Sequence, residues 1–330
     1  MIVIDNAPEK IGRLDGPHAE RIGLLEGITR FGGATPEEAE RLRLFDAPVE
    51  PVGLPRVPER RTTVEGPHGP IPVRLYLPEA REGVTPRPAF VWIHGGAFIG
   101  GDIEMPEAHH TATRVAAATG IPVISVDYRL CNETVHHPAP HDDCFTVYQW
   151  VRDSGHGIPT DPERVGVGGA SAGACLAAGV GVHGRDIGEP PASLALIYPL
   201  IHSPMPAPDK EHSTLLKALP PLFAPNPDMH SELMAIYLGS EGKPEENPGW
   251  AMPGWAEDLS GMPRTFIENC EFDELRASGE LFGDQLRSSG CEVEMHTVAG
   301  EVHGHLNVPG LPSAKRTCAR ISRWLEGTLR

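Results

Sequence analysis

The sequence has no long apolar segment. No stretch approaches the roughly 18–20 consecutive apolar residues that a membrane-spanning helix needs, so we expect no membrane span. The first eight residues also lack a basic segment followed by an apolar core, which is the pattern of a secretory signal. Both absences lead us to expect a cytoplasmic protein.

Positively charged residues are scarce. Lys and Arg number 28 against 45 Asp and Glu, which gives a formal net charge of −17 over 330 residues. Such an acidic balance argues against binding to nucleic acid or to anionic membranes. We therefore expect the partner to be a small molecule and not a nucleic acid.

Paired cysteines and metal-ligand patterns are missing as well. The six cysteines are scattered, with no Cys-x-x-Cys pair, which favours reduced and mostly buried thiols. Sixteen histidines are present, but none has an acidic partner at the spacing of a zinc enzyme. We expect neither a metal nor another cofactor.

The most informative motif is Gly-Ala-Ser-Ala-Gly at residues 169–173. It lies between an apolar run at residues 165–168 and a small-residue segment at 175–179, which predicts a strand, a tight turn and a helix. Such a turn exposes the serine hydroxyl at the edge of the sheet, and the free N–H groups at the helix start favour a developing oxyanion. The motif predicts Ser171 as a nucleophile, although alone it also fits an ordinary glycine-rich turn.

A second glycine-rich segment, His94-Gly95-Gly96-Ala97-Phe98, follows the apolar run Ala89–Ile93. Acyl transfer builds negative charge on the carbonyl oxygen, and each preset N–H donor lowers the barrier by roughly 3–4 kcal/mol. Glycines let the main chain come close enough to present such donors. The segment therefore predicts an oxyanion-binding loop.

An acid and a histidine follow the serine in the order that this architecture uses. Asp273 comes after the strand-like run at residues 264–270, and His303 comes after another at 291–298. His303 would accept the serine proton, and Asp273 would hold the imidazole in the right tautomer. Glu271 is an alternative acid, because side chains two apart in an extended segment share a face.

With these motifs, nearly the whole chain resembles the bacterial hormone-sensitive-lipase-like (family IV) esterases of the α/β-hydrolase superfamily. The motifs that carry the resemblance are His94-Gly95-Gly96-Ala97, Asp127-Tyr128-Arg129-Leu130, Pro138-Ala139 through Asp142-Asp143, Gly169-Ala170-Ser171-Ala172-Gly173, Asp273-Glu274-Leu275-Arg276 and His303-Gly304. The resemblance implies an α/β-hydrolase fold, a mostly parallel central sheet flanked by helices, with a helical cap. It favours Asp273 over Glu271 as the acid.

The resemblance also implies the residues of the oxyanion hole. These are the amides of Gly96, Ala97 and Ala172, with Gly95 helping to shape the loop. Ala97 stands where the family usually has a third glycine, and its N–H is still available.

Two further positions depart from the family pattern. Residues 131–137 replace the usual Ala-Pro-Glu continuation, so we expect that loop to be reshaped. His305 replaces a common aromatic residue and places a titratable group near the predicted site.

Apolar runs and helical patterns alternate through the middle of the chain, as in a parallel sheet covered on both faces. The predicted strands are 73–77, 89–93, 123–126, 165–167, 194–198, 265–268 and 293–298, and the predicted helices are 109–118, 142–152, 172–182, 274–288 and 313–328. We assign residues 56–202 and 257–330 to the catalytic core. Residues 1–55 and 203–256 do not fit the alternation, and the resemblance implies that they form the helical cap.

A cap over the serine would make a pocket, exclude water and select substrate. We expect the substrate to contact Phe98, Leu215, Leu219, Phe223 and His305. Half or more of the apolar cap residues could instead pack the cap on the core.

These inferences together predict a serine carboxylic ester hydrolase that works through an acyl-enzyme on short- to medium-chain or compact hydrophobic esters. The first alternative keeps the triad but hydrolyses an amide, lactone or carbamate, or tailors a natural product. The second is a ligand-binding homologue without catalysis, which the intact triad disfavours. A homodimer would be unsurprising by resemblance.

Overall fold

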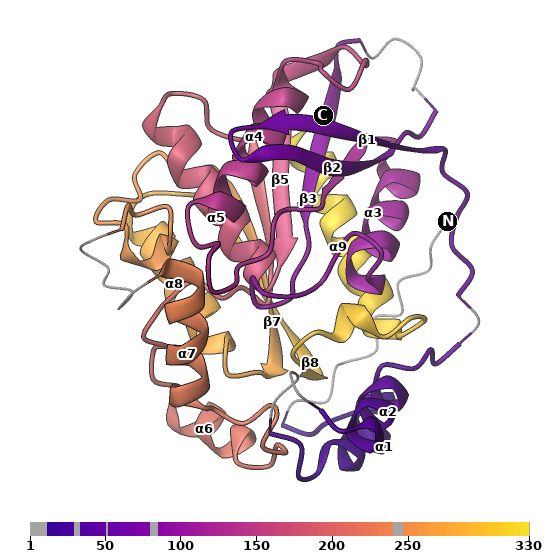
Figure 1. Cartoon of the computed structure of the whole chain (residues 1–330), viewed down its shortest axis with the longest axis vertical. Helices are drawn as coiled ribbons and strands as arrows, with labels where there is room; N and C mark the ends of the chain where they lie inside the picture. The colour runs from indigo at the N-terminus through magenta and orange to yellow at the C-terminus, as the bar shows by residue number, and fades with distance from the viewer. Residues whose placement is uncertain (1–11, 30–33, 51, 80–84, 240–246, 330) are drawn as a thin grey trace.

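The computed structural model describes residues 12–29, 34–50, 52–79, 85–239 and 247–329. Within them, eight strands form one sheet in the order β1-β2-β4-β3-β5-β6-β7-β8 (Figure 1). The strands are β1 (Glu59–Gly66), β2 (Gly69–Tyr76), β3 (Arg87–Ile93), β4 (Val123–Val126), β5 (Thr160–Ala170), β6 (Ser193–Ile197), β7 (Arg264–Phe272) and β8 (Val293–Val302). β2 runs antiparallel to β1 and β4, and the remaining neighbours are parallel, which confirms the predicted, mostly parallel sheet.

The inner strands are apolar along their length because helices cover both faces of the sheet. Every residue of β3 and β6 is buried, which gives the continuous apolar runs from which both strands were predicted. Strand β1 was not predicted, because its sequence is charged and Val64 is its one buried residue. Such charge is typical of an edge strand, where it blocks pairing with another chain.

Two helix layers enclose the sheet (Figure 1). Phe90 and Trp92 pack in a cluster with α3 (Pro106–Thr119) and α9 (Pro312–Thr328). Val91 and Ile93 face the other way, toward α4 (Ala139–Arg152), α5 (Ala172–Asp186) and α8 (Arg276–Ser288). No helix among the described residues is long and apolar enough to cross a bilayer.

Helix α5 is pressed against the ends of two strands. All its residues from 172 to 182 are buried, so it has no polar face over this stretch. A Cβ added to Gly173 would lie 2.2 Å from the carbonyl oxygen of Ile93, and one added to Gly169 would lie 2.4 Å from that of Gly173. Both positions therefore require glycine.

The two predicted cap segments meet at one end of the sheet. Helices α1 (Gly16–Arg21), η1 (Ile22–Leu25) and α2 (Pro36–Phe45) come from the first segment, and α6 (Lys210–Leu216) comes from the second. One apolar cluster joins them to the ends of β7 and β8, and its buried members are Leu25, Ile28, Phe45, Leu216, Leu219, Leu222, Phe272 and Val302. Residues 1–11, 30–33, 51 and 240–246 of these segments lie outside the described residues.

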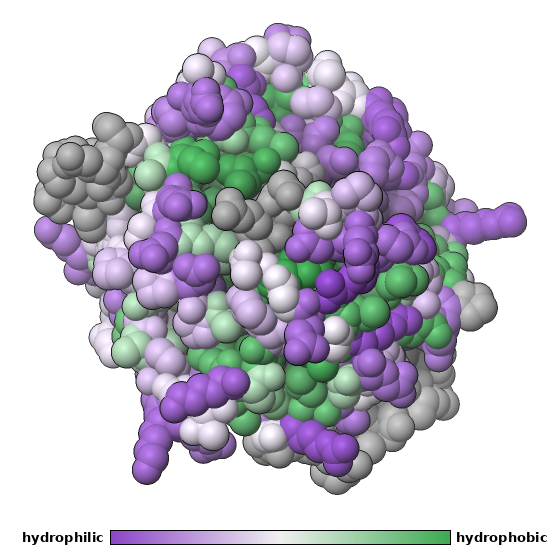
Figure 2. Space-filling view, turned by 60° about the horizontal axis from the view of Figure 1, so that its bottom comes forward, coloured by the Kyte–Doolittle hydropathy of each residue, from purple (hydrophilic) through white to green (hydrophobic). Residues whose placement is uncertain are grey.

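The rest of the second segment packs on the main core. Met234, Tyr237 and Leu238 of α7 (Pro227–Leu238) join the large cluster that lies under α4 and α5. The Tyr237 ring stacks on Phe98, with 3.8 Å between ring centroids. Figure 2 turns the lower end of Figure 1 toward the viewer and shows apolar side chains interspersed with hydrophilic ones on the surface there.

The packing at Gly173 makes a direct prediction. Gly173→Ala forces α5 away from backbone atoms that cannot move aside, so it should lower the free energy of unfolding by more than about 2 kcal/mol. Gly327→Ala in α9 is the control, because a Cβ there meets open space. That control should be neutral or stabilise by up to about 1 kcal/mol. Urea unfolding followed by circular dichroism measures both, and equal stability of the two variants would contradict the packing.

Candidate active site

Ser171 occupies the turn between β5 and α5 in a rare backbone conformation. Its φ is 55° and its ψ is −119°, which costs a residue with a side chain about 1–3 kcal/mol. The N–H of Ser171 donates to the carbonyl of Ile197 at 2.9 Å and holds the turn on β6. The turn presents the serine at the carboxyl ends of the strands, as the motif predicts.

The loops after β7 and β8 bring Asp273 and His303 to the serine. His303 Nε2 lies 2.9 Å from Ser171 Oγ, and His303 Nδ1 lies 2.7 Å from Asp273 Oδ2. A carboxylate oxygen only accepts, so Nδ1 carries a proton and Nε2 offers its lone pair to the serine hydroxyl. The three predicted residues thus form one continuous hydrogen-bonded chain.

Glu271, the alternative acid, has other partners. Its two carboxylate oxygens accept hydrogen bonds from the N–H groups of Gly12 at 2.6 Å and Gly300 at 2.7 Å. The Asp15 N–H also donates to the carbonyl of Gly300 at 3.2 Å. Glu271 therefore ties the N-terminal segment to the end of β8 just before His303, and Asp273 is the acid beside the imidazole.

The carboxylate of Asp273 tunes the imidazole of His303. Desolvation is the largest single effect on the pKa of His303 and lowers it. The charge and hydrogen bond of Asp273, together with the charges of Glu274 and Glu107, outweigh desolvation and raise that pKa above 6.5. The imidazolium that forms when His303 accepts a proton is therefore stabilised by nearby carboxylates.

The predicted oxyanion loop runs from His94 to Phe98. A Cβ on Gly96 would lie 2.0 Å from the carbonyl oxygen of Gly100, and its φ of 117° also favours glycine. Ala97 and Phe98 have positive φ values of 53° and 63°. Consecutive positive φ values at residues with side chains are rare and are typical of functional loops.

Three amides of the site are left free. The N–H groups of Gly96 and Ala97 donate to no other described residue, and the N–H of Ala172 lies in the first turn of α5, where a helix offers it no acceptor. The Gly95 N–H instead donates to Glu107 Oε2 at 2.8 Å. Gly95 thus shapes the loop, and the predicted donors that remain are Gly96, Ala97 and Ala172.

The buried side chain of His94 stabilises the loop through a hydrogen bond to the loop backbone. Its Nδ1 donates to the Gly95 carbonyl at 2.6 Å, and its ring stacks on Tyr128 with 4.3 Å between centroids. The Tyr128 hydroxyl in turn donates to the His94 carbonyl at 3.1 Å. Burial lowers the pKa of His94 to about 4, so the ring stays neutral near pH 7.

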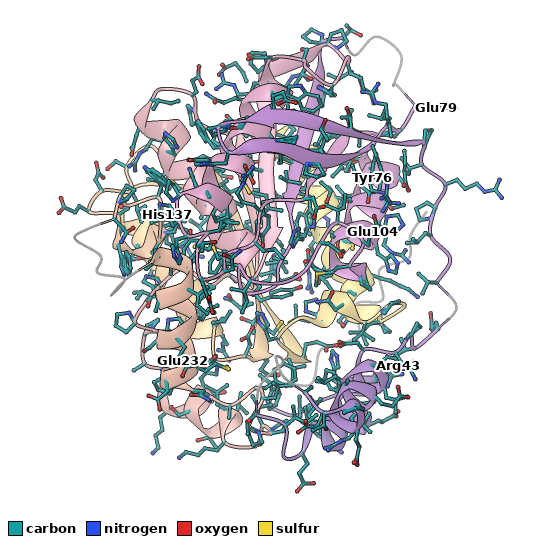
Figure 3. The ribbon with its side chains drawn as sticks, viewed as in Figure 1. Arg43, Tyr76, Glu79, Glu104, His137 and Glu232 are labelled. Carbon is teal, nitrogen blue, oxygen red and sulfur yellow. The ribbon has the colours of Figure 1, made fainter. Side chains whose placement is uncertain are left out.

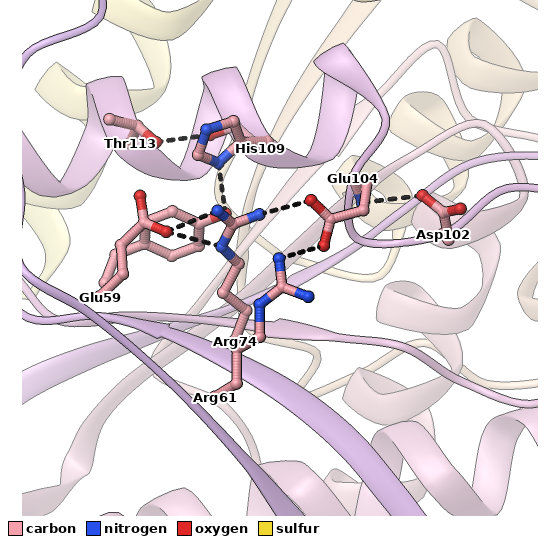
Figure 4. Close-up of polar contacts among 8 residues, drawn as sticks. Glu59, Arg61, Arg74, Asp102, Glu104, His109 and Thr113 are labelled. Carbon is pink, nitrogen blue, oxygen red and sulfur yellow. Dashed lines mark hydrogen bonds and ion pairs between the residues drawn. The ribbon is translucent and has the colours of Figure 1, made fainter.

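An ion-pair network lies beyond the oxyanion loop, in the segment just before α3 (Figure 4). Arg74 of β2 binds Glu59 of β1 at 2.6 Å and Glu104 at 3.0 Å, and Arg61 also binds Glu104 at 2.5 Å. Glu104 and Tyr76 lie near α3, on the opposite side of the molecule from His137 (Figure 3). The network connects the segment after the oxyanion loop to the edge strands.

The unusual loop at residues 131–137 docks on α7. The Asn132 side chain accepts hydrogen bonds from the N–H groups of Thr134 at 2.9 Å and Val135 at 3.1 Å, which closes a tight turn. The His136 ring then donates to the carbonyl of Ile236 at 2.7 Å. The loop is therefore attached to the same helix that supports Phe98 through Tyr237.

The predicted substrate-contacting residues have different positions. Phe98 is fully buried against Tyr237, and Leu219 is buried in the cap cluster, where Leu215 and Phe223 pack half-buried. All four therefore contribute to packing in this structure. Their contact with a substrate stays a prediction.

The prediction that His305 lines the pocket is wrong, because this side chain lies fully buried in the core. Its Nδ1 is 3.2 Å from Cys270 Sγ, and its Nε2 is 2.9 Å from Thr317 Oγ1. Burial lowers the pKa of His305 to about 4. The neutral His305 ring therefore holds the loop that carries His303 against the core.

One buried carboxylate of the site, that of Glu107, was missed from sequence, and it binds the oxyanion loop. Glu107 sits in no recognisable motif, since it looks like an ordinary acidic residue in the first turn of a helix. Glu301, which lies two residues before His303, pairs with His18 of α1. No group of three or more His, Cys, Asp or Glu that could hold a metal occurs in the part of the chain that the structure describes.

The contact between Asp273 and His303 makes a testable prediction. Asp273→Asn removes the negative charge, so the pKa of His303 should fall from above 6.5 in the native protein. Glu274→Gln is the matched control and should lower that pKa less, because Glu274 acts on the ring through charge alone. NMR titration of labelled imidazoles, assigned with a His303→Gln variant, gives the values. An unchanged pKa in Asp273→Asn would contradict the contact.

Comparisons with known proteins agree with this geometry. The family described as alpha/beta hydrolase fold matches residues 90–307. Esterase LipI of Mycobacterium tuberculosis is 33% identical over 286 residues, covering 84% of this chain and 83% of LipI. Arylacetamide deacetylase of Oryctolagus cuniculus is 26% identical over 326 residues, covering 82% of this chain and 81% of that protein. A solved esterase from Pyrobaculum calidifontis has a TM-score of 0.71 at 30% identity, covering 83% of this chain and 87% of that one. The chain therefore belongs to the alpha/beta hydrolase fold family, as its resemblance to the hormone-sensitive-lipase-like esterases predicts.

Proposed function

We propose that the protein is a serine carboxylic ester hydrolase that acts on short- to medium-chain or compact hydrophobic esters. The observation that carries the proposal is the hydrogen-bonded chain from Ser171 through His303 to Asp273, beside three free amides. The esterase names of several relatives support the same reaction class.

The first half of the reaction acylates the serine. His303 Nε2 accepts the Ser171 proton as Oγ attacks the ester carbonyl, and Asp273 stabilises the imidazolium that forms. The amides of Gly96, Ala97 and Ala172 hold the oxyanion of the tetrahedral intermediate, where each donor is worth about 3–4 kcal/mol. When the intermediate collapses, His303 returns the proton to the leaving alcohol and the acyl group stays on Oγ.

The second half hydrolyses the acyl-enzyme. Water replaces the alcohol, and His303 Nε2 accepts one of its protons as the oxygen attacks the acyl carbonyl. The same three amides hold the second oxyanion. Collapse expels Ser171 Oγ, which regains its proton from His303, and the carboxylic acid leaves.

The proposal predicts the activity of a Ser171→Ala variant. This change removes the nucleophile and should lower kcat for p-nitrophenyl esters by about 10⁴-fold or more. In a series from acetyl to dodecanoyl esters, kcat/KM of the native enzyme should peak at short or medium chains. Native activity that does not exceed that of the variant at any chain length would overturn the proposal.

Amide hydrolysis is the second candidate function. The relative named arylacetamide deacetylase favours it, as does the docked loop at residues 131–137. We expect the ester to be preferred, so kcat/KM for p-nitrophenyl acetate should exceed that for p-nitroacetanilide. Comparison of the two at equal enzyme concentration decides the question, and faster cleavage of the anilide would make the protein an amidase.

A further inference from the structure

Glu107 is the most deeply buried carboxyl group next to the predicted reaction centre. It lies in the first turn of α3 and is 1% exposed. Burying a carboxylate costs several kcal/mol unless hydrogen bonds compensate. Two donors near the serine compensate part of this cost, and burial still raises the pKa of Glu107 to about 7.

Both oxygens of Glu107 are occupied. Oε2 accepts the N–H of Gly95 at 2.8 Å, and Oε1 accepts the indole N–H of Trp92 at 3.0 Å. Trp92 belongs to β3, and Gly95 lies two residues beyond the end of that strand. The carboxylate therefore fixes the place where β3 becomes the oxyanion loop.

That place is next to the nucleophile. A Cβ built on Gly95 would lie 3.4 Å from Ser171 Cβ and 3.5 Å from Glu107 Oε2. The Gly95 carbonyl is also held, by His94 Nδ1. With both its N–H and its carbonyl bonded, Gly95 has little freedom to turn, and it leads directly into the free amides of Gly96 and Ala97.

We propose that Glu107 is a positioning residue of the oxyanion loop, which holds the Gly95 peptide so that the Gly96 and Ala97 amides face the oxyanion formed by attack of Ser171. This inference rests on the proposed esterase function. Glu107 itself touches neither the nucleophile nor the oxyanion. It acts through the backbone, where a misplacement of about 1 Å can lower the rate by about 100-fold.

Glu107→Gln tests the proposal. The amide keeps the size of the side chain but turns one acceptor into a donor, which conflicts with the N–H of Trp92 or of Gly95. We expect kcat for p-nitrophenyl butyrate to fall by about 10- to 100-fold while KM changes by less than about threefold. Affinity for an alkyl trifluoromethyl ketone, which forms a tetrahedral oxyanion on the serine, should fall in parallel with kcat/KM.

A second substitution, Trp92→Phe, provides a further test if the Glu107→Gln variant is unstable. In the double variant Trp92→Phe with Glu107→Gln, no indole N–H opposes the amide, and the Gln oxygen can accept from Gly95. The combined loss in kcat should therefore be smaller than the product of the two single losses. A role in stability alone predicts native kcat in every variant that remains folded, and thermal unfolding of each variant records the stability contribution separately.

Glu104→Gln is the matched control, because it removes a carboxylate three residues away that pairs with Arg74 and Arg61. Arg74 keeps its ion pair with Glu59 in this variant, so kcat should stay within about twofold of the native value. Native kcat and native ketone affinity in a folded Glu107→Gln variant would overturn the inference, and so would a loss that appears in KM alone. An inert native enzyme would instead defeat the esterase proposal itself.

Discussion

The close approach of helix α5 to the ends of β3 and β5 is the constraint on which the site depends. Gly169 and Gly173 leave no room for a side chain, and their neighbours are backbone carbonyls that cannot move away. This contact places Ser171 in its strained turn and directs the start of α5, with its free Ala172 amide, toward the oxyanion loop. Larger residues there would separate Ser171, the proposed nucleophile, from the amides proposed to hold the oxyanion.

Buried carboxylates hold the loops that complete the site. Asp273 orients the His303 ring, Glu271 ties the end of β8 to the N-terminal segment, and Glu107 accepts a hydrogen bond from the oxyanion loop. Glu301 adds a contact to His18 in the cap. Each carboxylate has a hydrogen-bond partner at least twelve residues away in the sequence, so its burial cost is reduced only when the two segments are correctly placed. The polar contacts thereby specify the geometry that the apolar core alone leaves open.

The sequence predicted the parts of the fold that have strong local patterns. The inner parallel strands could be located because burial on both faces makes them continuous apolar runs, and the strand-turn-helix around Ser171 because only small residues fit it. Strand β1 was missed because an edge strand carries charge. Helix α8 begins at Arg276, two residues after the predicted start, because the loop of Asp273 extends to Leu275.

Side-chain roles set by tertiary contacts were not predictable in the same way. His305 was expected in the pocket because it follows His303 closely, yet the chain turns it into the core against Cys270 and Thr317. Glu107 precedes Ser171 by more than sixty residues and is in no motif, so its contact with Gly95 emerges only from the packing of α3 on β3. Periodicity indicates which face a residue takes, and it does not indicate which distant backbone group that residue will meet.

The most direct test of this account is a crystal structure of the enzyme after reaction with a p-nitrophenyl alkylphosphonate. The account predicts phosphorus bonded to Ser171 Oγ, with the phosphonyl oxygen about 2.7–3.1 Å from the N–H groups of Gly96, Ala97 and Ala172. His303 should remain hydrogen bonded to Asp273. A label on another residue, or a phosphonyl oxygen turned away from those three amides, would contradict it.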